Sequence, residues 1–202
     1  MLAKPMQVAS VSTVISFGSN MGSRSRNIQN ALLQLSHFGK ILCTSFLYES
    51  SPMYYLDQNQ FLNGVCAFET DLAPLDLLFQ LKSIERRLGR EKTIENGPRP
   101  IDLDIIFYGD KIVELDSLKI PHPRMNERAF VLKPLCDINP DFLHPQLKET
   151  ANNLYLSLST EQKSQLTRVL SFYRANEERI LRVDNEIPII FGILNVTPDR
   201  FS

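Results

Sequence analysis

The chain has 202 residues, 43% of them hydrophobic and 22% charged, enough for one domain with an ample core and a fragment of a second. Its 22 Lys and Arg nearly balance 23 Asp and Glu, which argues against duplex nucleic acid or an anionic membrane as a partner. No run of 18 apolar residues occurs, so the sequence predicts no transmembrane helix.

The predicted elements begin after residues 1–12, which we interpret as a loose leader. Apolar runs and alternating residues predict strands at 13–17, 41–48, 61–69 and 101–107. Apolar residues at helical spacing predict long helices at about 26–37 and from Asp71 to Gly89. A short strand at 111–115 and a helical segment at 127–136 follow.

The element order is strand–helix–strand–strand–helix–strand, which is typical of the ferredoxin-like βαββαβ arrangement. The sequence therefore predicts an α+β domain over 13–158, a largely antiparallel sheet with helices on its faces. Residues 159–187 are polar and helix-prone, and we expect a helical linker there. The apolar strand and polar loop of 188–202 indicate the truncated start of a second domain, because a lone buried strand cannot fold by itself.

The three cysteines, Cys43, Cys66 and Cys136, have apolar neighbours and no zinc-type spacing. They are interpreted as reduced, mostly buried thiols of an intracellular protein. The first 48 residues contain no Asp or Glu and are rich in Ser. This composition is a weak signal for a mitochondrial transit peptide, so a cytoplasmic location is expected and a mitochondrial one is the alternative.

Asp102 and Asp104 stand two residues apart on a predicted strand. Side chains alternate along a strand, so both carboxylates are expected on one face, about 6.5–7 Å apart. Two adjacent carboxylates repel, and a cation is expected between them. Magnesium prefers such oxygen ligands, and two magnesium ions can clamp a phosphoryl displacement. For two aspartates alone, a solvated edge strand is the more frequent explanation.

Basic residues surround the two aspartates in the sequence: Arg90, Lys92 and Arg99 upstream, and His122, Arg124 and Arg128 downstream. A ligand with several phosphates needs both metal and fixed cations, so the combination favours a polyphosphate site. The sequence has neither a G-x-x-x-x-G-K-[ST] loop nor a Ser/His/Asp or Cys/His set. Neither a P-loop nor a covalent nucleophile is therefore predicted.

Asn63 is a polar residue on an otherwise apolar predicted strand. A buried amide needs hydrogen-bond partners, and a flat heterocycle stacked between Phe61 and Phe130 would supply them. The alternatives are an Asn satisfied within the protein and two ordinary core aromatics.

The segment GPRPIDLDI, Gly97 to Ile105, resembles the signature of 6-hydroxymethyl-7,8-dihydropterin pyrophosphokinases, enzymes of folate biosynthesis. The segments FGSNMG, FLN, IERRLGR and IPHPRMNERAFVLKPL match as well, so the resemblance covers about residues 13–146. The final segment, FGILNVTPDRFS, is similar to the opening strand of dihydropteroate synthase, the next enzyme of the pathway. This order resembles the fused folate enzymes of fungi, plants and some protozoa.

The resemblance implies transfer of pyrophosphate from ATP to the pterin, giving AMP and a pterin diphosphate. It implies that Asp102 and Asp104 bind two magnesium ions and that Arg90 and Arg99 assist the transfer. The positions implied around the pterin are Ser50, Met53, Phe61, Asn63 and Phe130. The positions implied around the ATP co-substrate are Lys82, Glu85, Lys92, Ile105, Lys119, His122 and Arg128.

The resemblance further implies a synthase domain as a partner in cis, and the kinase domain is expected to be monomeric. Asn96 departs from the family pattern, because many bacterial members have Trp there, and the loop 90–98 is one residue shorter than theirs. Two other functions stay open from the sequence. A magnesium-dependent D-x-D glycosyltransferase would need a parallel nucleotide-sugar domain, for which little chain precedes the aspartates. A non-catalytic scaffold for the synthase is disfavoured by the intact aspartates and arginines.

Overall fold

The computed structural model describes residues 11–91, 94, 96–174 and 177–182. The predicted start of a second domain, 188–202, and most of the predicted leader lie outside these residues. The strands of the main sheet are β1 (Val11–Ser19), β2 (Lys40–Thr44), β3 (Leu47–Ser50), β4 (Phe61–Thr70), β5 (Asp102–Tyr108), β8 (Leu166–Arg174) and β9 (Glu177–Arg182). A separate hairpin pairs β6 (Val113–Leu115) with β7 (Leu118–Ile120).

The helices are α1 (Arg24–Leu35), α2 (Pro74–Arg87), α3 (Ala129–Ile138), α4 (Ala151–Ser157) and α5 (Thr160–Ser164), with short 3-10 turns at Ser36–Phe38 and Met125–Glu127. None of the helices within the described residues is both long and apolar enough to cross a membrane.

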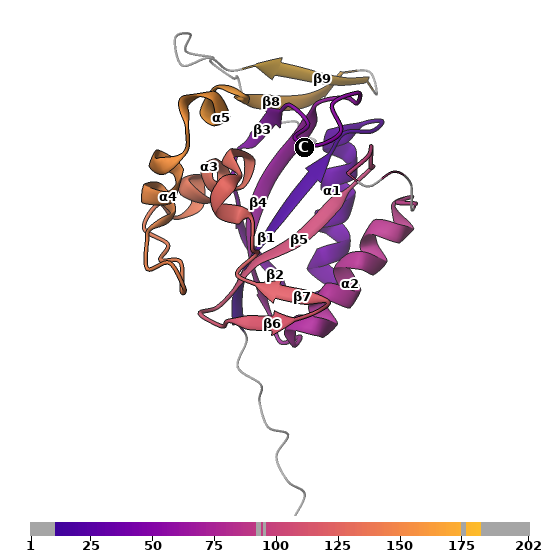
Figure 1. Cartoon of the computed structure of the whole chain (residues 1–202). Helices are drawn as coiled ribbons and strands as arrows, with labels where there is room; N and C mark the ends of the chain where they lie inside the picture. Colours follow the sequence, from indigo (N-terminus) through magenta and orange to yellow (C-terminus); the bar gives the residue numbers. More distant parts are fainter. Residues whose placement is uncertain (1–10, 92–93, 95, 175–176, 183–202) are drawn as a thin grey trace, which may run out of the picture.

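The main sheet has the strand order β5-β1-β4-β3-β8-β9, and β2 also pairs with β4 (Figure 1). Every pairing in it is antiparallel. The predicted α+β fold with its βαββαβ core is therefore confirmed. The strand predicted at 41–48 is divided into β2 and β3, because the Ser45 hydroxyl replaces a backbone carbonyl as acceptor for the Val65 N–H, at 3.0 Å.

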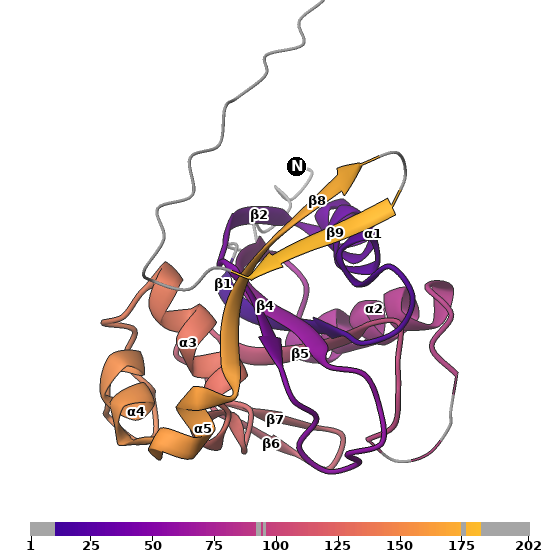
Figure 2. The same cartoon turned by 90° about the horizontal axis from the view of Figure 1, so that it is seen from above.

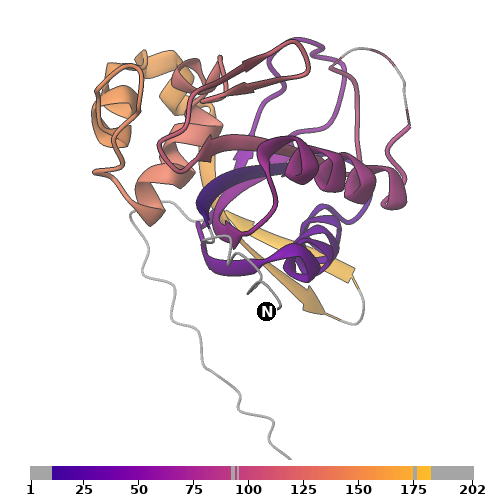
Figure 3. The same cartoon turned by 90° about the horizontal axis from the view of Figure 1, so that it is seen from below.

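Helices cover both faces of the sheet (Figures 1 and 3). On one face α1 and α2 bury an apolar cluster that includes Leu62 and Leu103. On the other face α3 and α4 bury a second cluster around Val65 and Phe107. Because strand residues alternate between the two faces, successive side chains of β5 point to opposite sides of the sheet. This alternation decides which side chains of β5 reach the functional site.

The helical linker predicted at 159–187 is wrong for most of its described length. Only the short helix α5 is helical, and the chain then forms β8 and β9, which extend the sheet beyond β3 (Figure 2). Without β8, the backbone groups of β3 would be left unpaired at a sheet edge. This pairing overrides the local helix preference.

The predicted leader, residues 1–12, extends too far at its C-terminal end. Val11 and Ser12 belong to β1, where they pair with Thr70 and Glu69 of β4. The expectation of mostly buried thiols holds for Cys66, where burial raises the pKa to about 12. It is wrong for Cys43, which is exposed because it lies on β2, a strand paired on one side only.

Candidate active site

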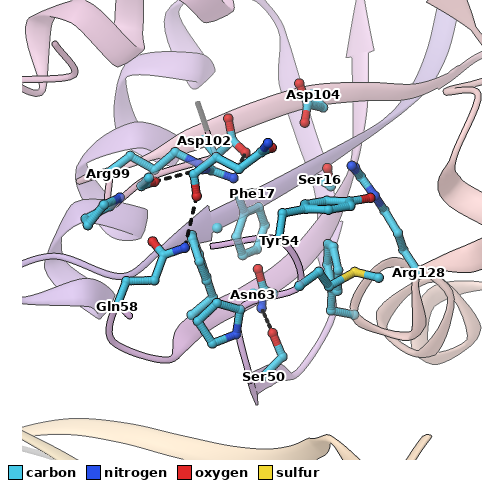
Figure 4. Close-up of a pocket in the computed structure, with 18 of the residues that line it drawn as sticks. Ser16, Phe17, Ser50, Tyr54, Gln58, Asn63, Arg99, Asp102, Asp104 and Arg128 are labelled. Carbon is cyan, nitrogen blue, oxygen red and sulfur yellow. Dashed lines mark hydrogen bonds and ion pairs between the residues drawn. The ribbon is translucent and has the colours of Figure 1, made fainter. Parts of the chain in front are cut away.

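A cavity of about 440 Å³ opens on the sheet face that also carries α3, a volume typical of small-molecule sites. Its floor is formed by strand residues from β1, β4 and β5, including Ser16, Asn63 and Asp104. Its walls are the loops at 51–58 and 90–99 and the segment 122–130 (Figure 4). Loops and the first turn of α3, which carries Phe130, surround the cavity on this face of the sheet.

Asp102 and Asp104 both line this cavity, as their alternation on a strand predicts. In the pairing of β5 with β1, Asp102 lies opposite Gly18 and Asp104 lies opposite Ser16. Leu103 between them is fully buried under the helices of the other face. Two carboxylates therefore converge on one floor.

Basic side chains of the protein supply the cations expected beside the aspartates. Arg90 Nη1 lies 2.5 Å from one carboxylate oxygen of Asp102, and Arg99 Nη2 lies 2.9 Å from the other. Lys82 Nζ lies 3.5 Å from Asp104. Burial opposes ionisation of Asp102, but Arg99, Arg90 and Lys82 together hold its pKa below the usual value. Asp102 is therefore ionised at neutral pH.

Glu85 on α2 does not line the cavity but organises two of its cations. Its carboxylate is only 2% exposed, lies 2.8 Å from Lys82 Nζ and 2.6 Å from Arg90 Nη1, and accepts the Leu103 N–H at 2.7 Å. Burial raises its pKa, while Lys82 and Arg90 act in the opposite direction. Glu85 thus fixes α2 and the loop after it against the strand that carries both aspartates.

The donor set of the two aspartates suits magnesium. Among the residues that the structure describes, no group of three or more His, Cys, Asp or Glu side chains converges as a metal site. Magnesium does not require one, because it is typically bound through one or two carboxylates plus waters and substrate phosphates. The two carboxylates on the cavity floor fit that pattern.

The five residues expected around a pterin all line the cavity: Ser50, Met53, Phe61, Asn63 and Phe130. Asn63 is 6% exposed, and its amide nitrogen donates to Ser50 Oγ at 2.9 Å (Figure 4). Its Oδ1 lies over Gly18, where an added Cβ would come within 2.7 Å of it. The alternative of an internally satisfied Asn is therefore correct for the amide nitrogen, while Asn63 still belongs to the cavity.

Of the residues expected around a nucleotide, Lys82, His122 and Arg128 line the cavity together with Arg90 and Arg99. Burial, with the nearby Arg128 and Arg124, lowers the pKa of His122 despite Asp104, so its ring is neutral at pH 7. The Nε atoms of Arg99 and Arg128 are buried and find no hydrogen-bond partner among the described residues. Both guanidinium groups therefore keep donors for an anion.

Three expected residues do not line the cavity: Glu85, Ile105 and Lys119. Ile105 is buried in the cluster under α1 and α2, because alternation turns it away from the face of Asp104. Lys119 lies on the exposed hairpin, with Nζ 3.9 Å from Glu114. Lys92 lies outside the described residues.

Sequence reasoning missed Asn20, which joins three loops. Its side chain is 1% exposed; Nδ2 donates to Gln58 Oε1 at 2.8 Å and to the Asn59 carbonyl at 3.1 Å, and Oδ1 accepts the Arg99 N–H at 2.8 Å. Gln58 Nε2 in turn donates to the Asn96 carbonyl at 2.9 Å. A single Asn in a turn-rich loop gives no sequence signal for such distant partners.

A second missed contact crosses the mouth of the cavity. Arg124 Nη1 donates to the Tyr54 hydroxyl at 3.2 Å, and its guanidinium carbon lies 5.3 Å from the centre of the Tyr54 ring. The sequence predicts Arg124 among the basic residues near the two aspartates but predicts no role for it in the site. Only the fold shows that loop 51–58 passes beside it.

Comparisons with known proteins agree with this geometry. Residues 14–140 match the family "7,8-dihydro-6-hydroxymethylpterin-pyrophosphokinase (HPPK)". "Folic acid synthesis protein FOL1" of Dictyostelium discoideum is 44% identical over 197 residues, covering 93% of this chain and 30% of that protein. The "2-amino-4-hydroxy-6-hydroxymethyldihydropteridine pyrophosphokinase" of Pseudomonas aeruginosa is 43% identical over 133 residues, covering 65% of this chain and 82% of that protein.

A solved structure has the same fold: the crystal structure of an "HPPK-DHPS in complex with substrates" superposes with a TM-score of 0.67 at 17% sequence identity, over 86% of this chain and 48% of that one. The chain thus spans about a third of FOL1 and about half of the fused protein of known structure.

Proposed function

Because this chain belongs to the 7,8-dihydro-6-hydroxymethylpterin-pyrophosphokinase (HPPK) family, we propose that it transfers pyrophosphate from ATP to 6-hydroxymethyl-7,8-dihydropterin. The products are AMP and the pterin diphosphate, a step of folate biosynthesis. The observation that carries the proposal is the pair of carboxylates, Asp102 and Asp104, on the floor of a cavity whose walls are basic.

At one end of the cavity the pterin lies between the rings of Phe61 and Phe130. Both rings line the cavity, and stacking on aromatic faces suits a flat heterocycle. Asn63 and Ser50 lie on the floor between them and offer hydrogen-bonding groups to the edge of the pterin. Met53 covers this end from loop 51–58. Its flexible thioether can adapt to the apolar face of the pterin.

The basic side chains beside these rings hold the triphosphate. The guanidinium groups of Arg99 and Arg128 lie 4.9 and 5.6 Å from the ring centres of Phe61 and Phe130, and their Nε atoms have no hydrogen-bond partner among the described residues. Guanidinium groups suit bidentate phosphate contacts. Lys82 and His122 also line the cavity, and Glu85 fixes Lys82. Lys92 is proposed as a further nucleotide contact. Ile105 and Lys119 are left out of the set that contacts ATP through side chains.

Asp102 and Asp104 hold two magnesium ions, which when bound neutralise the phosphate charge and orient the reacting groups. The residues of the chain then position the pterin hydroxymethyl oxygen in line with the β-phosphorus. Arg90 and Arg99 stabilise the charge that develops on the transferring group and on the leaving AMP. Because positioning and charge stabilisation do most of the work in phosphoryl transfer, no covalent nucleophile is required.

The proposal is tested by measuring AMP release from ATP, magnesium and the pterin. Asp102→Asn and Asp104→Asn remove one charge each while keeping the shape, and each is expected to lower kcat at least about a hundredfold, as loss of a charge-stabilising group does. Asp116→Asn, on the exposed turn between β6 and β7, is the matched control. Full activity of both cavity variants would refute the assignment.

The antiparallel sheet and the family membership remove the basis for a glycosyltransferase. In the whole protein the kinase domain is followed in cis by a dihydropteroate synthase domain, in keeping with the fused HPPK-DHPS of similar fold. A kinase domain that runs from Val11 to Arg182 replaces the limits 13–158, because β1 begins at Val11 and β8 and β9 belong to the same sheet. The start of a second domain at 188–202, a monomeric kinase domain and a cytoplasmic location complete the proposal. Size measurements on the purified chain and localisation of the tagged whole protein check the last two.

A further inference from the structure

The helix α5 and the start of β8 lie directly behind the proposed pterin end of the cavity. β8 pairs with β3 (Figure 1), and Leu166 stands opposite Ser50 in that pairing. Directly opposed residues in an antiparallel pair point to the same face. Leu166 therefore lies beside Ser50 on the sheet face that carries the cavity.

One side chain ties α5 to the wall of the cavity. Gln162 Nε2 donates to the Glu127 carbonyl at 3.0 Å, and Glu127 directly precedes Arg128, which lines the cavity. Gln162 Oε1 accepts the Ser159 N–H at 2.9 Å and so completes a capping box at the start of α5. The two ends of this amide thus have separable roles, one in the helix and one in the contact.

The contact leaves only a small space. A cavity of about 20 Å³ separates the two sides, lined by Ser50, Met53 and Phe130 from the proposed pterin site and by Gln162, Gln165 and Leu166 from the segment behind it. Such a space holds about one water molecule. A displacement of α5 or β8 is therefore passed on to the residues that face the pterin.

The segment behind the cavity is not part of the region that defines the family. The family match ends at residue 140, before α5. The alignment with FOL1 covers 93% of this chain and so extends well past residue 140, whereas the shorter P. aeruginosa enzyme aligns with 65% of it. The segment with α5 and β8 therefore lies outside the family match but within the alignment with FOL1.

We propose that Gln162 and Leu166 are positioning residues for the pterin, acting through the segment 127–130 and through Ser50. The inference rests on the proposed function for the identity of the ligand. Gln162 holds the backbone that carries Arg128 and Phe130, and Leu166 supports Ser50, the partner of Asn63.

Gln162→Glu removes the contact with Glu127 and keeps the one with Ser159. The carboxylate can still accept the Ser159 N–H, as in a capping box, but it has no N–H to donate to the Glu127 carbonyl. Gln29→Glu, exposed on α1 on the other face, introduces the same charge as a control. Loss of this hydrogen bond is expected to raise the pterin KM and dissociation constant roughly three- to tenfold, with the ATP KM and thermal stability equal to those of the control. Leu166→Ala is expected to raise the pterin constants with the ATP KM unchanged, and to lower thermal stability because Leu166 packs against the core. Thr167→Ala, on the opposite side of β8, is expected to leave the pterin constants unchanged.

The measurements are KM for both substrates from AMP release, and pterin binding by calorimetry with magnesium and a non-hydrolysable ATP analogue. Pterin affinity unchanged in both Gln162→Glu and Leu166→Ala would overturn the inference. An equal rise of both KM values would also overturn it, because that pattern indicates a general structural defect. A parent protein that binds the pterin but releases no AMP would refute the proposed function instead, and the calorimetry would still test Gln162 and Leu166.

Discussion

Replacing Asn20 with Ala removes the junction between three loops of the site. Asn20 is 1% exposed, and its amide makes three hydrogen bonds, to Gln58, to the Asn59 carbonyl and from the Arg99 N–H. The substitution leaves the backbone bond from Asn20 N to the Arg99 carbonyl in place. It therefore removes side-chain contacts and leaves the turn itself intact.

The size of the effect follows from these contacts. A net contribution of about 0.5–1.5 kcal/mol for each of three hydrogen bonds gives a loss of about 2–4 kcal/mol in the free energy of unfolding. With a urea dependence of about 2 kcal/mol per molar, the unfolding midpoint falls by about 1–2 M. Because the loops freed are those at 51–58 and 90–99, KM for both substrates is expected to rise as well.

Urea unfolding followed by far-ultraviolet circular dichroism measures the midpoint, and AMP release measures both KM values. Asn30→Ala, exposed on α1, is the control and is expected to behave like the parent. A midpoint and KM values for Asn20→Ala equal to those of Asn30→Ala would refute the idea that this amide holds the loops together.

Two further predictions follow from buried contacts. In Gly18→Ala the new methyl group would lie 2.7 Å from Asn63 Oδ1 and must displace that amide from the cavity floor. We therefore expect calorimetry to show weaker pterin binding with ATP binding retained. A pterin affinity equal to that of the parent would contradict the placement of Asn63. His144 is 5% exposed and burial lowers its pKa below the usual 6.5, so the unfolded chain takes up its proton first as the pH falls. The free energy of unfolding then decreases as the pH drops through about 6.5 and levels off below the folded pKa. Urea titrations at several pH values should show a smaller decrease in His144→Gln than in the parent. An equal decrease in the two proteins would contradict this role of His144.

Local patterns were sufficient to predict the core fold and the two aspartates with their basic surroundings, whereas Ser50, Met53 and Lys82 came from the resemblance. The alternation of β5 places Asp102 and Asp104 on one face because strand geometry has a period of two residues. The same rule, applied to the next residue, would have removed Ile105 from the set of side chains facing the ligand. That position came from resemblance alone, and the geometry of the strand contradicts a side-chain contact there.

What the sequence did not predict depends on contacts between distant segments. β8 is a strand because β3 lies beside it, and no pattern within 159–174 indicates that neighbour. The partners of Asn20 are 38 or more residues away in the chain. Local propensity cannot register such pairings, since their free energy arises only after the sheet has formed.

The ion pairs of the cavity bear on how ligands enter it. Asp102 is paired with two arginines and Asp104 with Lys82, so these carboxylates and cations neutralise each other. Under the proposed function, Asp102 and Asp104 would hold the metal and the arginines would contact phosphate, so binding of a magnesium nucleotide would exchange these partners. Either ligand alone would leave part of this partly exposed set without a partner, at a free-energy cost that solvent screening reduces. The arrangement therefore favours joint entry of metal and nucleotide over either one alone.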